Sequence, residues 1–207
     1  SAKPKVTKEV WDNDDGSTNG DNAGWGQTAD WMINDDYTDT TQFKLTATIP
    51  ADDDFADYET YKLVFNDTMS EGVTFDGIAS VKVNNTEVLA TGENAYVLDG
   101  VAVGDAGATW TLTITDLLKY ASDLTDGATV EVIYNAHLNE GADITEITET
   151  TTTNKNTVFL QYSNNPNWNG EGEEKLGETE KETVSAPGCR AQHTAGSAET
   201  ETDSAAS

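Results

Sequence analysis

The sequence predicts an all-β protein, an antiparallel β-sandwich with at most one short helix. Apolar and polar residues alternate with a period of two in many short segments, which is the pattern of strands that bury one face. Asparagine, aspartate, glycine and proline residues, which favour turns, separate these segments. About nine short strands divided by such turns are typical of a sandwich.

The expected strands follow one another at short intervals. In chain order they cover residues 5–11, 42–49, 61–67, 73–77, a hairpin over 79–88, 108–115, 129–138 and 157–163. Asp76-Gly77 is predicted to end the fourth strand, and Asn84-Asn85 to turn the hairpin. Leucines near helical spacing predict one short helix at Thr115–Gly127, capped by Thr115 or Asp116 and ended by the glycine.

The charge of the chain limits its partners. Its 207 residues include 38 acidic and 11 basic side chains, for a net charge of -27. Such a chain cannot neutralise nucleic-acid phosphates, and anionic membrane surfaces repel it. No apolar run is long enough for membrane insertion, and the single cysteine, Cys189, excludes a disulfide framework and a cysteine zinc site. With no visible signal peptide, we expect a mature or excised fragment of an extracellular protein.

Two segments differ from the rest in composition. Residues 12–30 form a polar, acidic, glycine-rich insertion within a domain that is expected to span residues 1–184. Residues 185–207 contain almost no large apolar side chain, so they are expected to be a disordered or vector-derived tail.

The insertion contains half of a calcium-binding pattern. Asp15, Ser17 and Asn19 supply side-chain oxygens at alternate positions, and Gly20 follows as a turn residue. The closing bidentate glutamate is absent, because Gly26 stands at the twelfth position. The segment is therefore interpreted either as a calcium site or as a flexible acidic loop. No cofactor is expected to be required.

The sequence lacks the usual catalytic motifs. It has no Gly-x-Ser-x-Gly, no phosphate-cradling loop and no His-Glu-x-x-His. Of the two histidines, His193 lies in the tail and His137 falls on the polar side of a predicted strand. Acidic residues are so abundant that no pair can be singled out as a glycosidase dyad. We therefore expect a protein that is not an enzyme, and a β-sandwich hydrolase is the weakest hypothesis.

Several segments occur together in a characteristic order. They are "KPKVTKEVW", "INDDYTDTTQFKLTATIP", "VFNDTMSEGVTF", "VEVIYNAHLNEGA" and "NKNTVFLQYSNNP". Over most of residues 3–184 this set resembles the isopeptide-forming D2-type domain of Gram-positive fimbrial and pilus subunits. The resemblance implies an immunoglobulin-like sandwich of the CNA/pilin type. It also implies a structural or adhesive module of a sortase-assembled pilus or surface adhesin, extracellular and anchored to the cell wall. Neighbouring pilin subunits, other domains of the same protein and a host or glycan receptor are the partners it implies.

Members of that family join a lysine on the first strand to an asparagine on the last strand, and a buried acid promotes the reaction. On this chain the resemblance implies Lys8 and Asn156. Strand alternation places Lys8 between two valines on one face, whereas Lys5 points the other way and is the second choice. Asn154 has the same parity as Asn156 but lies further outside the strand, so it also ranks second.

The acid implied by the resemblance is Asp67, at the end of a core strand, with Glu140 in a loop as the runner-up. Burial favours the neutral forms of both partners. A buried lysine loses its charge as its pKa falls, and the free amine becomes a nucleophile. A buried aspartic acid has a raised pKa, so it can donate to the asparagine carbonyl and pass a proton to the departing ammonia. The expected chemistry is a single self-cross-linking event.

A second hypothesis is a carbohydrate- or ligand-binding β-sandwich, with calcium as its one candidate cofactor. Four tryptophans could provide stacking platforms for sugars, and they are Trp11, Trp25, Trp31 and Trp168. The alternative is that they cover the edges of the sandwich or pack the long first loop.

Overall fold

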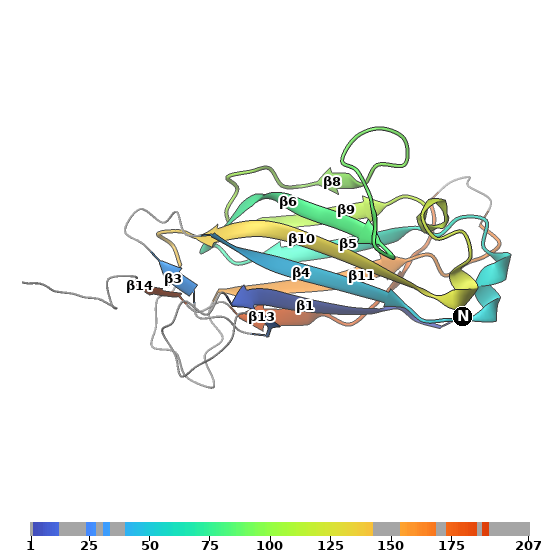
Figure 1. Cartoon of the computed structure of the whole chain (residues 1–207), viewed down its shortest axis with the longest axis horizontal. Helices are drawn as coiled ribbons and strands as arrows, with labels where there is room; N and C mark the ends of the chain where they lie inside the picture. Colours follow the sequence, from blue (N-terminus) through green and yellow to red (C-terminus); the bar gives the residue numbers. More distant parts are fainter. Residues whose placement is uncertain are drawn as a thin grey trace, which may run out of the picture.

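A computed structural model describes residues 2–12, 24–27, 31–33, 40–142, 154–168, 173–185 and 188–190. Most of these residues form two antiparallel sheets packed face to face, as Figure 1 shows. The first sheet has the order β2 (Gly24–Gly26), β1 (Lys5–Asp12), β4 (Thr40–Ile49), β10 (Ala128–Leu138), β6 (Val73–Val83) and β7 (Thr86–Glu87). The second has the order β12 (Gly177–Glu178), β11 (Lys155–Tyr162), β5 (Leu63–Met69), β9 (Thr109–Ile114) and β8 (Val97–Asp99), and β13 (Glu182–Ser185) also pairs with β11. The predicted all-β sandwich is confirmed.

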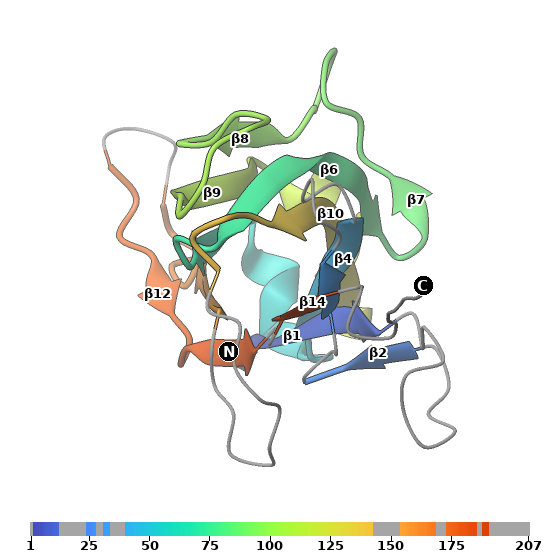
Figure 2. The same ribbon diagram turned by 90° about the vertical axis from the view of Figure 1, so that its left-hand side faces the viewer.

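The core lies between the two sheets and follows from the alternation in the sequence. On β4 the buried side chains are Phe43, Leu45, Ala47 and Ile49, every second residue. β10 and β11 repeat this pattern along their length. Viewed nearly along the strands in Figure 2, edge strands β8 and β12 of the second sheet lie on one side, and β2 and β7 of the first on the other.

The segment expected to be a helix differs from the prediction. Thr115–Gly127 contains two 3-10 turns, η2 (Leu117–Lys119) and η3 (Leu124–Asp126), and no α-helix. The carboxylates of Asp116 and Asp123 each accept a hydrogen bond from the backbone two residues on, so each caps a separate short turn. The leucines that suggested one helix instead begin the two turns. A further 3-10 turn, η1 (Asp53–Asp57), was not predicted.

The Asp76-Gly77 pair does not end a strand. β6 runs continuously through it, and its register against β10 shifts on either side of Tyr134 and Asn135. Gly77 has a φ of 117°, so the pair forms a bulge and not a turn. The other predicted turn is confirmed, because Asn84 and Asn85 both have positive φ between β6 and β7.

The C-terminal residues continue the fold beyond β11. β13 pairs with the outer side of β11, and Val184 lies opposite Asn156. Ser185, the first residue of the expected tail, ends β13, and β14 (Gly188–Arg190) pairs in parallel with β3 (Trp31–Ile33). The candidate calcium ligands Asp15, Ser17 and Asn19, and the tail from residue 191 onward, lie outside the described residues. In the parts of the chain that are described, no helix is long and apolar enough to span a membrane.

Candidate functional site

Four polar side chains meet inside the apolar core, two from each sheet. Lys8 and Tyr134 come from β1 and β10 of the first sheet, and Asp67 and Asn156 come from β5 and β11 of the second. Lys8 is 1% exposed, and the other three are 0% exposed. Charged and amide side chains are rarely buried to this degree without a role or a partner.

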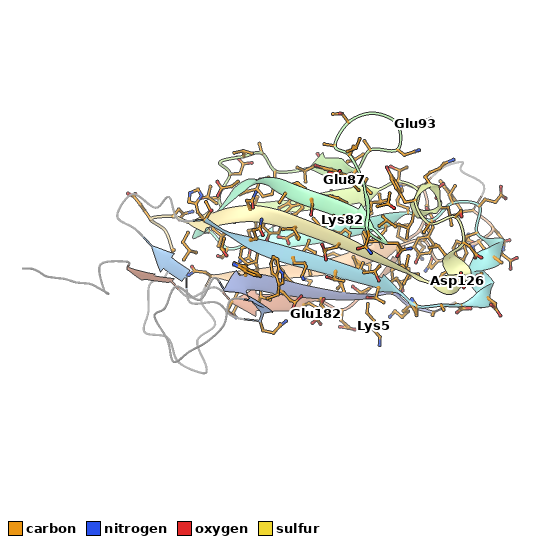
Figure 3. All side chains as sticks on the ribbon, viewed as in Figure 1. Lys5, Lys82, Glu87, Glu93, Asp126 and Glu182 are labelled. Atoms are coloured by element: carbon orange, nitrogen blue, oxygen red, sulfur yellow. The ribbon has the colours of Figure 1, made fainter. Side chains whose placement is uncertain are left out.

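The position of Lys8 follows from the pattern of β1. Alternate residues Val6, Lys8 and Val10 are all buried, so the lysine enters the core with its two valine neighbours. Lys8 lies opposite Leu45 of β4 in the ladder. Lys5, the second choice, is exposed and points outward, as Figure 3 shows. The structure therefore brings Lys8, and not Lys5, to the site.

The acid and the amide lie on neighbouring strands of the second sheet. Asp67 pairs with Val158 of β11, and Asn156 pairs with Met69 of β5, so the two polar side chains are diagonal neighbours on one buried face. Glu140, the runner-up acid, is exposed. The structure brings Asp67 to the amide and leaves Glu140 at the surface.

Asn154 lies beside the site in a different role. It is 8% exposed and has a φ of 53°, a left-handed conformation that asparagine tolerates better than most residues. Its carbonyl accepts a hydrogen bond from Nδ2 of Asn156 at 3.1 Å. This bond turns the Asn156 amide so that its oxygen faces the hydroxyl of Tyr134.

The shortest contact in the site joins the lysine to the acid. Nζ of Lys8 donates to Oδ2 of Asp67 at 2.7 Å. The Lys8 nitrogen also lies 5.2 Å from the ring centre of Phe43 and 5.4 Å from that of Tyr134. The Tyr134 hydroxyl lies 3.4 Å from each carboxylate oxygen of Asp67 and 3.5 Å from Oδ1 of Asn156.

Burial dominates the electrostatics of the site. Desolvation lowers the pKa of Lys8, although the nearby Asp67 carboxylate favours the charged amine. Desolvation likewise raises the pKa of Asp67, against the opposing effects of Lys8 and Tyr134. Both shifts favour a neutral amine beside a neutral acid. The pKa of Tyr134 is also raised well above its usual value by burial, so its hydroxyl keeps its proton.

Tyr134 is the residue that sequence reasoning missed. It lies on the inward face of β10, where the residues at alternate positions are apolar. A signal was present, because a buried tyrosine hydroxyl usually requires a hydrogen-bonding partner. The sequence could not identify that partner, since it lies on the opposite sheet.

The remaining candidates do not form a second site among the described residues. Trp11 and Trp25 contact each other edge to face, with ring centres 5.2 Å apart. Nζ of Lys44 lies 4.5 Å from the ring centre of Trp25. Trp168 is partly buried, and the Trp31 side chain lies outside the described residues. Nδ1 of His137 lies 2.7 Å from Oδ2 of Asp76 on the sheet surface. Within the described ranges, no group of three or more acidic, histidine or cysteine residues could hold a metal ion.

Comparison with known proteins identifies the family. The family model for Gram-positive pilin backbone subunit 2, Cna-B-like domain, matches residues 37–166, more than half of the chain. The chain belongs to this pilin backbone family. Its members are structural, non-enzymatic subunits of surface pili, so the expected resemblance and the expected non-enzymatic character are confirmed. No curated protein is significantly similar to the chain.

Solved structures of major pilins share the fold. The 35 kDa C-terminal fragment of GBS80 from Streptococcus agalactiae is 19% identical with a TM-score of 0.59, covering 90% of this chain and 56% of that chain. BcpA from Bacillus cereus is 19% identical with a TM-score of 0.51, covering 89% and 40%. SpaD from Corynebacterium diphtheriae is 16% identical with a TM-score of 0.51, covering 88% and 36%. The chain therefore spans little more than half of the first of these proteins and less of the other two.

Proposed function

We propose that this chain is a structural module of a Gram-positive pilus backbone, stabilised by an amide bond that it forms between Nζ of Lys8 and Cγ of Asn156. Asp67 acts as the proton shuttle. One observation supports this proposal above all others: a fully buried Lys8–Asp67 pair at 2.7 Å, in which Asp67 shares a buried sheet face with the amide of Asn156. A buried pair that only held the two sheets together would not require an amide beside it.

The reaction begins when a proton passes from the Lys8 ammonium to the Asp67 carboxylate, which the apolar surroundings favour. The lone pair of Nζ attacks Cγ of Asn156, and the carbonyl electron pair moves onto Oδ1. Asp67 then gives its proton to Nδ2 and takes one from Nζ. The C–Nδ2 bond breaks, ammonia leaves, the new amide remains, and Asp67 is again protonated. The fold fixes the geometry of all three groups, so a single turnover needs no binding step.

The product links the first strand of the domain to β11, the last long strand. Closing a loop of about 150 residues stabilises a fold by about 5 kcal/mol on the chain-entropy account used for disulfides. The chain has one cysteine and cannot close such a loop with an internal disulfide. A covalent link between β1 and β11 suits a subunit that is pulled from its ends in a fibre.

Membership of the pilin backbone family supports a set of partners. We propose that neighbouring pilin subunits, or other domains of the same protein, contact this module in a wall-anchored pilus that a sortase assembles. A glycan-binding role has less support, because one face of Trp25 is already covered by Lys44.

Intact mass tests the cross-link. The wild-type protein is expected to be lighter than its sequence mass by one ammonia, and Asp67→Ala is expected to restore the full mass. A wild-type protein that has its full sequence mass would contradict the proposal. Peptide mapping of the linked fragments identifies the two residues.

A further inference from the structure

We propose that Tyr134 is a second catalytic residue of the cross-linking reaction, because its hydroxyl donates a hydrogen bond to Oδ1 of Asn156 as that oxygen gains negative charge. This inference rests on the proposed function. It assigns to Tyr134 a hydrogen bond to Oδ1 in the tetrahedral intermediate, in addition to the one that the buried acid can donate to the same carbonyl.

The resting contacts of the hydroxyl leave it free to act. It has one proton and faces three acceptor oxygens at nearly equal distances, 3.4 Å for both oxygens of Asp67 and 3.5 Å for Oδ1 of Asn156. All three contacts are longer than a strong O–H···O bond. A proton shared in this way moves to the acceptor whose charge grows, and catalytic hydrogen bonds often shorten only as the reaction proceeds.

The orientation of the amide supports the same assignment. Nδ2 of Asn156 donates to the carbonyl of Asn154, so Oδ1 is the atom that faces Tyr134. When Nζ of Lys8 attacks Cγ, the developing charge therefore appears beside the hydroxyl. Burial raises the pKa of Tyr134 and favours the protonated hydroxyl, which is the form that can donate.

The ring is held in place by aromatic neighbours from both sheets. Phe43 stacks on Tyr134 with ring centres 5.2 Å apart, and Trp110 meets it edge to face at 5.2 Å. Phe75 packs at 5.8 Å. A donor fixed before the reaction needs little reorganisation during it, which is the property that makes oxyanion-stabilising groups effective.

The test compares rates of bond formation in two matched variants. Tyr134→Phe removes only the hydroxyl. Tyr61→Phe is the control, because Tyr61 is also 0% exposed in an aromatic cluster, and its hydroxyl has no hydrogen-bond partner among the described residues. Each protein is made by cell-free synthesis, synthesis is stopped, and samples quenched in acid over time are read by intact mass.

Tyr134→Phe is expected to lose ammonia about 100-fold more slowly than the wild type, as when one oxyanion donor is removed from an enzyme. It still reaches the cross-linked mass, because Lys8 and Asp67 remain. Tyr61→Phe is expected to match the wild type. An unchanged rate in Tyr134→Phe, or equal slowing in both variants, overturns the role of Tyr134 but leaves the cross-link itself standing. A wild-type protein that never loses ammonia overturns both proposals.

A purely structural role gives a different result. If the hydroxyl only stabilises the fold, the double variant Tyr134→Phe/Asn156→Ala, which cannot form the bond, has a lower urea midpoint than Asn156→Ala alone. Tyr134→Phe by itself then forms the bond at the wild-type rate. If the hydroxyl acts in catalysis, Tyr134→Phe forms the bond slowly, and the double variant Tyr134→Phe/Asn156→Ala has nearly the same urea midpoint as Asn156→Ala.

Discussion

Replacing Asn156 with alanine gives the cleanest measure of the cross-link. The substitution removes the electrophile and keeps the 2.7 Å contact between Lys8 and Asp67. The variant is expected to have its full sequence mass and to lose the loop-closure stabilisation of about 5 kcal/mol. The lost hydrogen bond from Nδ2 to Asn154 adds about 1 kcal/mol.

The thermal midpoint converts this loss into an observable. For a domain of this size, 1 kcal/mol shifts the midpoint by about 2–4 °C. The total loss of about 6 kcal/mol is therefore expected to make Asn156→Ala unfold about 12–24 °C below the wild type in scanning calorimetry. Intact mass on the same samples reports whether the bond is present.

Asn154→Gly is the matched control. Glycine adopts the positive φ of this position without strain, so the variant removes the neighbouring amide and keeps the backbone that supports Asn156. It is expected to lack one ammonia, like the wild type, and to unfold above Asn156→Ala because it keeps the loop-closure stabilisation. The loop-closure reasoning is refuted if Asn156→Ala lacks the bond yet unfolds within about 2 °C of a linked wild type. The choice of asparagine is wrong if Asn154→Gly is the variant with full mass.

Four further predictions concern the surroundings of the bond. Asp67→Ala should show the full mass, whereas Glu140→Gln, which changes the exposed runner-up, should still lack one ammonia. Lys8→Met leaves Asp67 buried with a raised pKa. The free energy of unfolding of this variant is expected to be greatest below about pH 3.9, the pKa of aspartate in the unfolded chain. It is expected to fall by up to about 1.4 kcal/mol per pH unit as the pH rises from there toward the pKa of Asp67 in the folded state. Urea titrations should show this slope for Lys8→Met and not for Lys8→Met/Asp67→Asn. Val184→Asp places a carboxylate at a buried position of β13, opposite Asn156, and should lower the fraction of linked protein measured by intact mass. Thr183→Asp, on the exposed face of β13, should leave that fraction unchanged. Calcium chelation should leave the linked mass unchanged, since none of the four groups at the site needs a metal.

Local pattern was sufficient to predict the long strands β1, β4, β5, β9, β10 and β11, whereas the short edge strands β2, β8 and β12 were not predicted. The parity of β1 distinguished Lys8 from Lys5. Asn156 was implied by the family resemblance, because Asn154 has the same parity, and the structure places Asn156 on the buried face of β11. Alternation works here because each strand has one buried face, so a single inward residue fixes the orientation of the others.

Local pattern did not predict features that depend on pairing or packing with a strand distant in the sequence. Asp76-Gly77 suits a turn as well as a bulge, and its pairing with β10 selects the bulge. Tyr134 gains its partners only when the two sheets pack, because Asp67 and Asn156 lie on the opposite layer. The role of β13 is equally non-local, since it covers β11 from the far end of the chain.

The energetics of the unlinked core explain why these residues favour a reaction. Burying an amine, a carboxyl group and an amide together is unfavourable, and apolar residues of similar volume often make a more stable core than a buried ion pair. Neutralising Lys8 and Asp67 relieves part of that penalty and produces the nucleophile and the acid. Forming the amide removes the ionisable lysine altogether and adds the loop-closure stabilisation. The features that make Lys8 and Asp67 unfavourable before the reaction therefore drive the core toward the linked state, and once ammonia has left the site nothing remains to reverse it.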